Sequence, residues 1–235
     1  MPPARTLLPS VVFAALAVAD SVAAGKRSST TARRLRYALK PALMPALATA
    51  FLRVPPGSRA HRHTGLLRTG TASAQAFSWG GDVALLGPSK RSFLIGVGSF
   101  FGAHVAYIAA FLSVRGETED YDTAGLRLAL GLWLTATPLM SSAAARQDPA
   151  LRAPVAAYAT ILSAMFASSR MLDPALPPGA RRTLQAGTAL FLVSDSVLAT
   201  QKFLLAEPRP ALETLVMATY TAGQGLIAAG AARAT

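Results

Sequence analysis

Eight stretches of mostly apolar residues divide this chain, and they constrain its fold more than any other feature. A helix needs roughly 20 such residues to cross the hydrocarbon core of a bilayer. Short segments rich in Gly, Pro and charged residues separate the stretches, such as GPSKR at 87–91 and AEPRP at 206–210. We therefore predict eight membrane-spanning helices, at 7–24, 37–54, 66–86, 93–114, 124–143, 153–170, 183–204 and 211–231.

The composition agrees with a membrane protein. Only 14% of the residues are charged and the mean hydropathy is +0.38, whereas soluble domains carry about 25% charged residues. No segment between the stretches is long enough to form a soluble domain. We therefore predict an all-α fold, a polytopic membrane helix bundle in which residues 1–235 form one integral membrane domain.

The net charge of +12 comes from short basic clusters between the apolar stretches. Nucleic acid would require a continuous basic face, so we exclude it and expect contact with anionic lipid head groups. The basic residues are nearly all Arg and the apolar ones are rich in Ala, which is typical of GC-rich genomes. We expect a multi-pass protein of a bacterial cell (inner) membrane. Cysteine is absent, which excludes disulfides and thiolate metal sites.

The first stretch has two interpretations. Arg5, the apolar run 7–18 and the small residues at 22–24 are typical of a cleavable signal peptide, which would leave seven spans. However, the run continues through Asp20 and is followed at once by a strongly basic segment, which tends to stay in the cytoplasm. We favour a retained helix. Because later loops place similar basic charge on the opposite side, the charge pattern does not decide the orientation.

Ionisable residues inside the stretches are candidates for a functional site. An acidic residue near the centre of a membrane helix costs about 2.5–3.5 kcal/mol on insertion scales, and such residues usually face the bundle interior. Four ionisable residues lie well inside their spans: Lys40, Asp82, His104 and Asp195. Four others lie near span ends, where contact with water or head groups explains them: Asp20, Arg127, Lys202 and Glu213.

Polar residues also recur at helical spacing, which places them on shared faces. Gln75, Ser78 and Asp82 share one face, and Asp195 and Lys202 share another, roughly 10 Å apart along the axis at 1.5 Å per residue. Two further stripes have such spacing: His104 with Tyr107, and Glu213 with Tyr220 and Gln224. The stripes predict a polar interior, although single polar residues can also serve only to join membrane helices.

The two aspartates stand in similar contexts, FSWGGDVALLG and LFLVSDSVLAT, which are 113 positions apart at Asp82 and Asp195. At the same offset Tyr107 corresponds to Tyr220. This pattern suggests two parallel four-helix repeats, residues 1–122 and 123–235.

Five ordered motifs resemble one family: LKPALMP at 39–45, AFSWGGDVALLG at 76–87, GVGSFFGAHVAYIAAF at 96–111, VAAYATILSAMFASS at 155–169 and LFLVSDSVLATQKF at 190–203. Together with the eight-span layout they resemble the YhhN-like family, whose characterised members are lysoplasmalogenases. The resemblance covers about residues 35–230. It implies hydrolysis of the vinyl ether bond of a lysophospholipid, to a fatty aldehyde and a glycerophospho head group. Bacterial members need not share that substrate.

The resemblance also implies which residues form the functional site. The residues that match the family's motifs are Lys40, Pro41, Ser78, Gly81, Asp82, His104, Tyr107, Tyr158, Ser194, Asp195, Lys202 and Phe203. Vinyl ether cleavage requires a proton donor and an ionised partner, and two carboxylates in a poorly solvated site can divide these tasks. We therefore predict Asp82 and Asp195 as the catalytic pair, without assigning the acid, and His104 as a reserve acid or base. The predicted substrate-binding residues are Lys40, Tyr107, Tyr158, Lys202, Tyr220, Ser78 and Ser194.

Other functions are open at this point. Intramembrane acids and a repeat also describe a small proton-coupled transporter or exporter, and a lipid-binding protein without chemistry is a third hypothesis. A hydrolase should have a cavity that opens sideways to lipid with both aspartates in it, while a carrier needs a path to either side. We predict no cofactor and no metal, and we interpret HRH at 61–63 as a basic loop.

Overall fold

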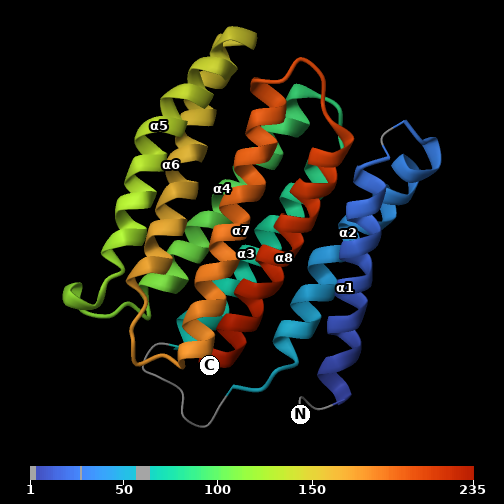
Figure 1. Cartoon of the computed structure of the whole chain (residues 1–235). Helices are drawn as coiled ribbons and strands as arrows, with labels where there is room; N and C mark the ends of the chain where they lie inside the picture. Colours follow the sequence, from blue (N-terminus) through green and yellow to red (C-terminus); the bar gives the residue numbers. More distant parts are fainter. Residues whose placement is uncertain (1–3, 27, 57–63) are drawn as a thin grey trace.

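The computed structural model describes residues 4–26, 28–56 and 64–235, and eight α-helices make up most of this part of the chain (Figure 1). They are α1 (Ala4–Ala24), α2 (Thr30–Leu52), α3 (Thr64–Ala84), α4 (Lys90–Leu112), α5 (Thr123–Gln147), α6 (Arg152–Ser168), α7 (Pro178–Phe203) and α8 (Pro210–Ala234). Each predicted span corresponds to one of these helices. The predicted all-α membrane bundle is thus confirmed.

Every helix begins somewhat earlier than the hydropathy pattern predicted, and two begin five or more residues earlier, because local capping extends them into polar sequence. Helix α2 starts at Thr30 rather than near residue 37, since the side chain of Ser29 accepts a hydrogen bond from the backbone N–H of Ala32 at 3.2 Å. Helix α7 starts at Pro178 rather than near residue 183, and proline is favoured at the first helical position because its N–H would be unpaired there. Basic residues in these first turns are therefore helical.

Five segments are long and apolar enough to span a membrane: Leu7–Ala24, Lys90–Leu112, Thr123–Gln147, Pro149–Met171 and Pro210–Ala234. Helices α2, α3 and α7 are less apolar, and they carry Lys40, Asp82 and Asp195 respectively. These three helices therefore contribute Lys40 and both predicted carboxylates to the site region. The chain is an integral membrane protein.

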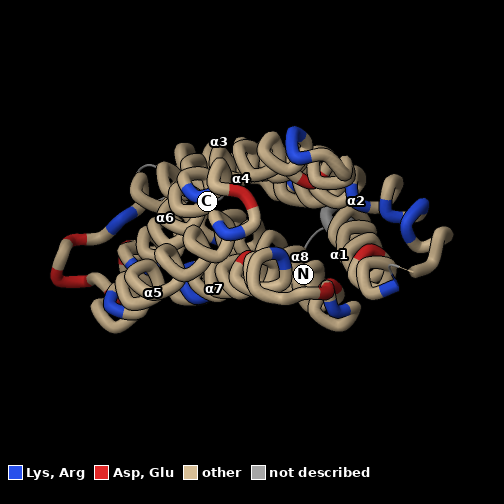
Figure 2. The backbone as a smooth tube through the Cα atoms, turned by 90° about the horizontal axis from the view of Figure 1, so that it is seen from above, with Lys and Arg blue, Asp and Glu red and all other residues tan. Residues whose placement is uncertain are grey.

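Consecutive helices form four close hairpins, α1–α2, α3–α4, α5–α6 and α7–α8. Viewed from above, the α1–α2 hairpin lies at one end of the bundle, the α5–α6 hairpin lies at the other, and α8 lies between them (Figure 2). Helix α8 contacts α1, α2 and α3 as well as α7, whereas α7 contacts α5 and α6 only sparsely. This loose seam between α7 and the α5–α6 hairpin positions the site described below.

Small residues allow the closest helix contacts. A Cβ atom at Gly223 would lie 2.9 Å from the carbonyl oxygen of Gly187, so the α7–α8 crossing requires glycine there. Close backbone approach of this kind is the usual basis of helix packing in lipid, where no hydrophobic effect drives helices together. The predicted internal repeat agrees with the pattern of four hairpins but stays a prediction, which superposition of residues 1–122 on 123–235 tests.

Candidate active site

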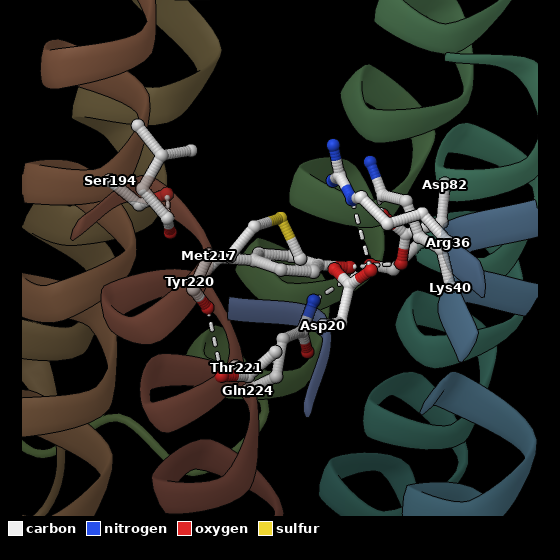
Figure 3. Close-up of polar contacts among 11 residues, drawn as sticks. Asp20, Arg36, Lys40, Asp82, Ser194, Met217, Tyr220, Thr221 and Gln224 are labelled. Carbon is white, nitrogen blue, oxygen red and sulfur yellow. Dashed lines mark hydrogen bonds and ion pairs between the residues drawn. The ribbon is translucent and has the colours of Figure 1, made fainter. Parts of the chain in front are cut away.

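Asp82 lies near the end of α3 and is almost completely buried. Its Oδ2 accepts a hydrogen bond from the hydroxyl of Tyr220 on α8 at 2.8 Å, and its Oδ1 is 3.4 Å from Nζ of Lys40 on α2 (Figure 3). The preceding residue, Gly81, leaves room for the ring of Phe100, which a Cβ atom would approach to 2.5 Å. Three helices therefore give this carboxylate one cationic and one phenolic partner.

Asp195 lies on α7 and has a different set of partners. Its Oδ2 accepts a hydrogen bond from the hydroxyl of Tyr158 on α6 at 2.5 Å. His104 on α4 lies behind this pair, with Nε2 at 3.1 Å from the Tyr158 oxygen and 3.8 Å from Asp195 Oδ2. The second carboxylate is therefore held by a tyrosine and an imidazole, and α4, α6 and α7 meet around it.

Three aromatic rings lie between the two clusters and fix their geometry. Phe100, Phe191 and Tyr220 contact one another edge to face, with ring centroids 5.5–6.4 Å apart. This is the preferred arrangement of aromatic pairs. It holds the Tyr220 hydroxyl toward Asp82, and the edge of the His104 ring packs against Phe191 with centroids 5.0 Å apart.

Both aspartates line one cavity of about 200 Å³ with largely apolar walls. Lys40 and Tyr220 lie beside Asp82 on its wall, and Tyr158 lies beside Asp195. Other lining residues that the sequence analysis predicted for the site are Ser194 and Lys202. The cavity therefore combines two carboxylates, two phenols and two ammonium groups in a mostly apolar enclosure.

Helices α5 and α7 form one side of the cavity. Leu132, Ala136 and Met140 share one face of α5 and line the cavity. Ser196 lies well inside α7, lines the cavity and is exposed. Because Ser196 is far from the helix ends, this side of the cavity lies at the level of the hydrocarbon core.

Lys202 lies in the last turn of α7 and is exposed. Its Nζ stands 4.2 Å from the centroid of the Phe93 ring, which also lines the cavity. A cation over an aromatic face is held by the quadrupole of the ring. The ammonium group of Lys202 is therefore placed between the cavity and the helix-end surface.

Three residues predicted for the site do not line the cavity: His104, Tyr107 and Ser78. His104 is fully buried and reaches the cavity only through Tyr158 and Asp195. The Tyr107 hydroxyl donates to Oε1 of Gln224 at 2.5 Å, and Nε2 of Gln224 donates to Oγ of Ser78 at 2.9 Å. Their inward orientation was predicted correctly, but they lie in the layer behind the cavity wall.

The prediction that contact with water or head groups explains Asp20 and Glu213 is wrong, because both side chains are buried although they lie near helix ends. Oδ1 of Asp20 accepts a hydrogen bond from Nε of Arg36 at 3.0 Å, which joins α1 to α2. Figure 3 shows this ion pair close to Lys40 and Asp82. A hairpin alignment of the first two helices could have revealed the pair, since Asp20 and Arg36 lie at similar distances from the turn between them.

Metal ligands do not cluster in the described part of the chain: residues 4–26, 28–56 and 64–235 contain no group of three or more His, Asp or Glu residues that could hold an ion. The sequence HRH at 61–63 lies outside the described residues.

The fold and the site together define a class, a polytopic helical membrane protein with two carboxylates in one largely apolar cavity. Comparison with known proteins gives the family. The chain belongs to the YhhN family, whose model matches residues 35–231. It is also 33% identical over 153 residues to the lysoplasmalogenase TMEM86B of Homo sapiens, an alignment that covers 65% of this chain and 59% of that protein. No solved structure shows a significant match.

The family match begins at residue 35, within α2. It therefore includes Arg36, Lys40 and every residue of the cavity wall, but α1 and Asp20 lie outside it. The chain spans about 59% of the length of the human relative. The similarity to that protein covers part of each chain rather than the whole of either.

Proposed function

We propose that this protein is an intramembrane hydrolase of lysoplasmalogenase type, which cleaves the vinyl ether bond of a lysophospholipid. The observation that carries the proposal is the cavity that contains both Asp82 and Asp195 and has walls on α5 and α7, and lipid would enter it through the loose seam between these two helices. Membership of the YhhN family and the similarity to a human lysoplasmalogenase support it. The site lies where a membrane lipid can reach it without leaving the bilayer.

The reaction needs one acid, one base and one water molecule. A carboxylic acid protonates the β-carbon of the vinyl ether, which leaves an oxocarbenium ion at the α-carbon. The second carboxylate stabilises this cation and takes a proton from the water that attacks it. The resulting hemiacetal loses the glycerol oxygen as an alcohol and becomes a fatty aldehyde. The same division of work between two carboxyl groups operates around the oxocarbenium-like transition state of glycosidases.

Asp82 and Asp195 act as this pair. Their surroundings differ, since Asp82 has the ammonium of Lys40 at 3.4 Å whereas Asp195 has the Tyr158 hydroxyl and the His104 ring. Pairs of carboxyl groups in unlike surroundings can hold different protonation states, which is what an acid and a base require. His104 does not line the cavity, so we assign it to the positioning of Tyr158 and Asp195 rather than to contact with substrate.

The proposed substrate has one alkenyl chain and one phosphate. The apolar face of α5, with Leu132, Ala136 and Met140, suits the chain. Lys202 is roughly 10 Å from Asp195 along α7 at 1.5 Å per residue, and a glycerol group also separates the phosphate of such a lipid from its vinyl ether. Lys202 therefore binds the phosphate while the vinyl ether lies beside the aspartates.

The transporter hypothesis requires a path that opens to either side of the membrane, and the lipid-binding hypothesis without chemistry expected no cavity. A cavity that holds both aspartates and borders the seam between α5 and α7 supports the hydrolase over both. We place the protein in a bacterial cell membrane, in contact with anionic lipids through its basic helix ends (Figure 2).

The test is an assay of the purified protein with a lysoplasmalogen and with the saturated ether lipid of the same chain length, with products identified by mass spectrometry. We expect fatty aldehyde from the vinyl ether only. Asp82→Asn and Asp195→Asn should each abolish the product while the proteins express and unfold normally. Full activity in either variant would refute the carboxylate pair, and the absence of activity in the unmodified protein on any vinyl ether lysolipid would refute the proposed function.

A further inference from the structure

A row of buried polar residues runs along the inner face of α3 from Asp82 toward the other end of the bundle. Thr71, Gln75, Ser78 and Asp82 are separated by four, three and four positions, so they share one face of the helix. Their exposed fractions are 0%, 1%, 0% and 1%. At 1.5 Å per residue the row is roughly 16 Å long. It extends beyond the cavity wall, to which only Asp82 belongs among these four residues.

The half of the row nearest the cavity is satisfied by protein groups. Asp82 accepts from Tyr220, and Ser78 accepts from Gln224, whose carbonyl accepts in turn from Tyr107. The hydrogen bonds Asp82–Tyr220 and Ser78–Gln224 join α3 to α8 one helical turn apart. They fix the register of the two helices, which run antiparallel.

The outer half of the row is not satisfied in this way. Neither Oγ1 of Thr71 nor either side-chain amide atom of Gln75 has a hydrogen-bond partner among the residues that the structure describes. A buried polar group without a partner costs several kcal/mol in the bilayer core. Buried groups of this kind are normally satisfied by internal water molecules, which make about three hydrogen bonds each.

Helix α8 offers no polar partner at the same level. When the two hydrogen bonds are continued toward the end of α3 at Thr64, Ile227 falls opposite Gln75 and Ala231 falls opposite Thr71. Both are buried, and Ile227 packs against Gly187 of α7. Apolar residues therefore stand at the level of the unpaired groups, whereas Tyr220 and Gln224 supply polar partners nearer the cavity.

We infer that the inner face of α3 carries a chain of internal water molecules, which leads from the end of the bundle near Thr64 to Asp82. The role of these waters rests on the proposed function, because hydrolysis consumes one water molecule per turnover. An alkenyl lipid that enters between α5 and α7 fills the cavity, so water needs a second route. Thr71 and Gln75 hold the outer waters, and Ser78, Gln224 and Tyr107 connect them to the site.

The absence of cysteine gives a direct test, because a single introduced thiol has no background. Thr71→Cys and Gln75→Cys are to be treated in membranes with silver ion, which is close to water in size and reacts with thiols. Thiols that remain are then counted with maleimide after denaturation. The matched control is Thr188→Cys: Thr188 is equally buried, but its hydroxyl bonds Ser169 and Gln185 on the other side of the bundle.

We expect silver to block the thiols at positions 71 and 75 at least about tenfold faster than the thiol at 188. If the thiols at positions 71 and 75 react with silver as slowly as the control thiol at 188, the water chain is refuted. This measurement does not depend on turnover, so labelling of positions 71 and 75 without vinyl ether cleavage would refute the proposed function and leave the water chain standing.

Turnover provides the second readout. Thr71→Val and Gln75→Leu keep side-chain size and remove the groups that hold water. If the chain supplies the hydrolytic water, kcat should fall about tenfold, equivalent to 1.36 kcal/mol of barrier, while KM for the lipid stays unchanged. Thr188→Val should leave both constants unchanged. An equal fall of kcat in Thr188→Val, or a change confined to KM, would contradict a role in water supply.

Discussion

Replacing Tyr158 with phenylalanine tests how the second carboxylate is held. The variant keeps the ring and removes only the hydroxyl, which donates to Asp195 at 2.5 Å and lies 3.1 Å from Nε2 of His104. A hydrogen bond to a charged group contributes about 1.5–3 kcal/mol. Since each 1.36 kcal/mol of barrier is a factor of ten in rate, kcat should fall about 10- to 150-fold.

The assay is release of fatty aldehyde from a lysoplasmalogen by the purified variant, with thermal unfolding measured in parallel. Tyr37→Phe is the matched control, because the Tyr37 side chain is 56% exposed and its hydroxyl donates only to the carbonyl oxygen of Leu86 at 3.3 Å. The control should keep full activity. If Tyr158→Phe retains activity within about twofold of the unmodified protein, the hydroxyl does not position Asp195 and the reasoning is refuted.

A double-mutant cycle extends this prediction to His104. If His104 acts through the Tyr158 hydroxyl, His104→Gln should lower kcat in the unmodified protein but add little in the Tyr158→Phe background, since residues of one network are not additive. Multiplicative effects of the two substitutions would instead identify His104 as an independent acid or base.

Three further outcomes are expected. Lys202→Gln should raise KM for the phosphate-bearing lysolipid with little change in kcat, because Lys202 lines the cavity away from the aspartates; an unchanged KM would remove it from the phosphate site. Gly223→Ala should lower the free energy of unfolding by about 1–3 kcal/mol, as its Cβ would lie 2.9 Å from a backbone oxygen of α7, whereas Gly131→Ala, with no neighbour within 4 Å, should not. Hydrogen bonding to Lys90 lowers the pKa of Asp148, so this pair stabilises the fold above the unfolded pKa and the effect is lost as pH falls through the lowered pKa. Acid unfolding of Asp148→Asn should accordingly show a shallower pH dependence than that of the unmodified protein.

The helices and the inward direction of their polar faces could be predicted from the sequence, because both depend on local patterns. Hydropathy marks where a chain can cross a bilayer, and helical spacing marks which side chains share a face. Lys40, Asp82 and Asp195, which lie well inside their predicted spans, all line the cavity.

The partners of these residues could not be predicted, because they depend on which helices meet. Nothing in the local pattern says that Asp82 bonds Tyr220 while Asp195 bonds Tyr158. A helix face also does not separate the cavity wall from the layer behind it, which is why His104 was predicted to serve as a reserve acid or base but lies outside the cavity.

The ion pair between Asp20 and Arg36 has a consequence for how the protein enters the membrane. Each charge is costly to bury alone in a membrane helix, but the two side chains meet across the first hairpin at 3.0 Å. Insertion of α1 and α2 as a pair would neutralise both charges at once. We therefore expect the translocon to release these helices into lipid together, and Asp20→Asn to delay the integration of α2 in a cell-free insertion assay.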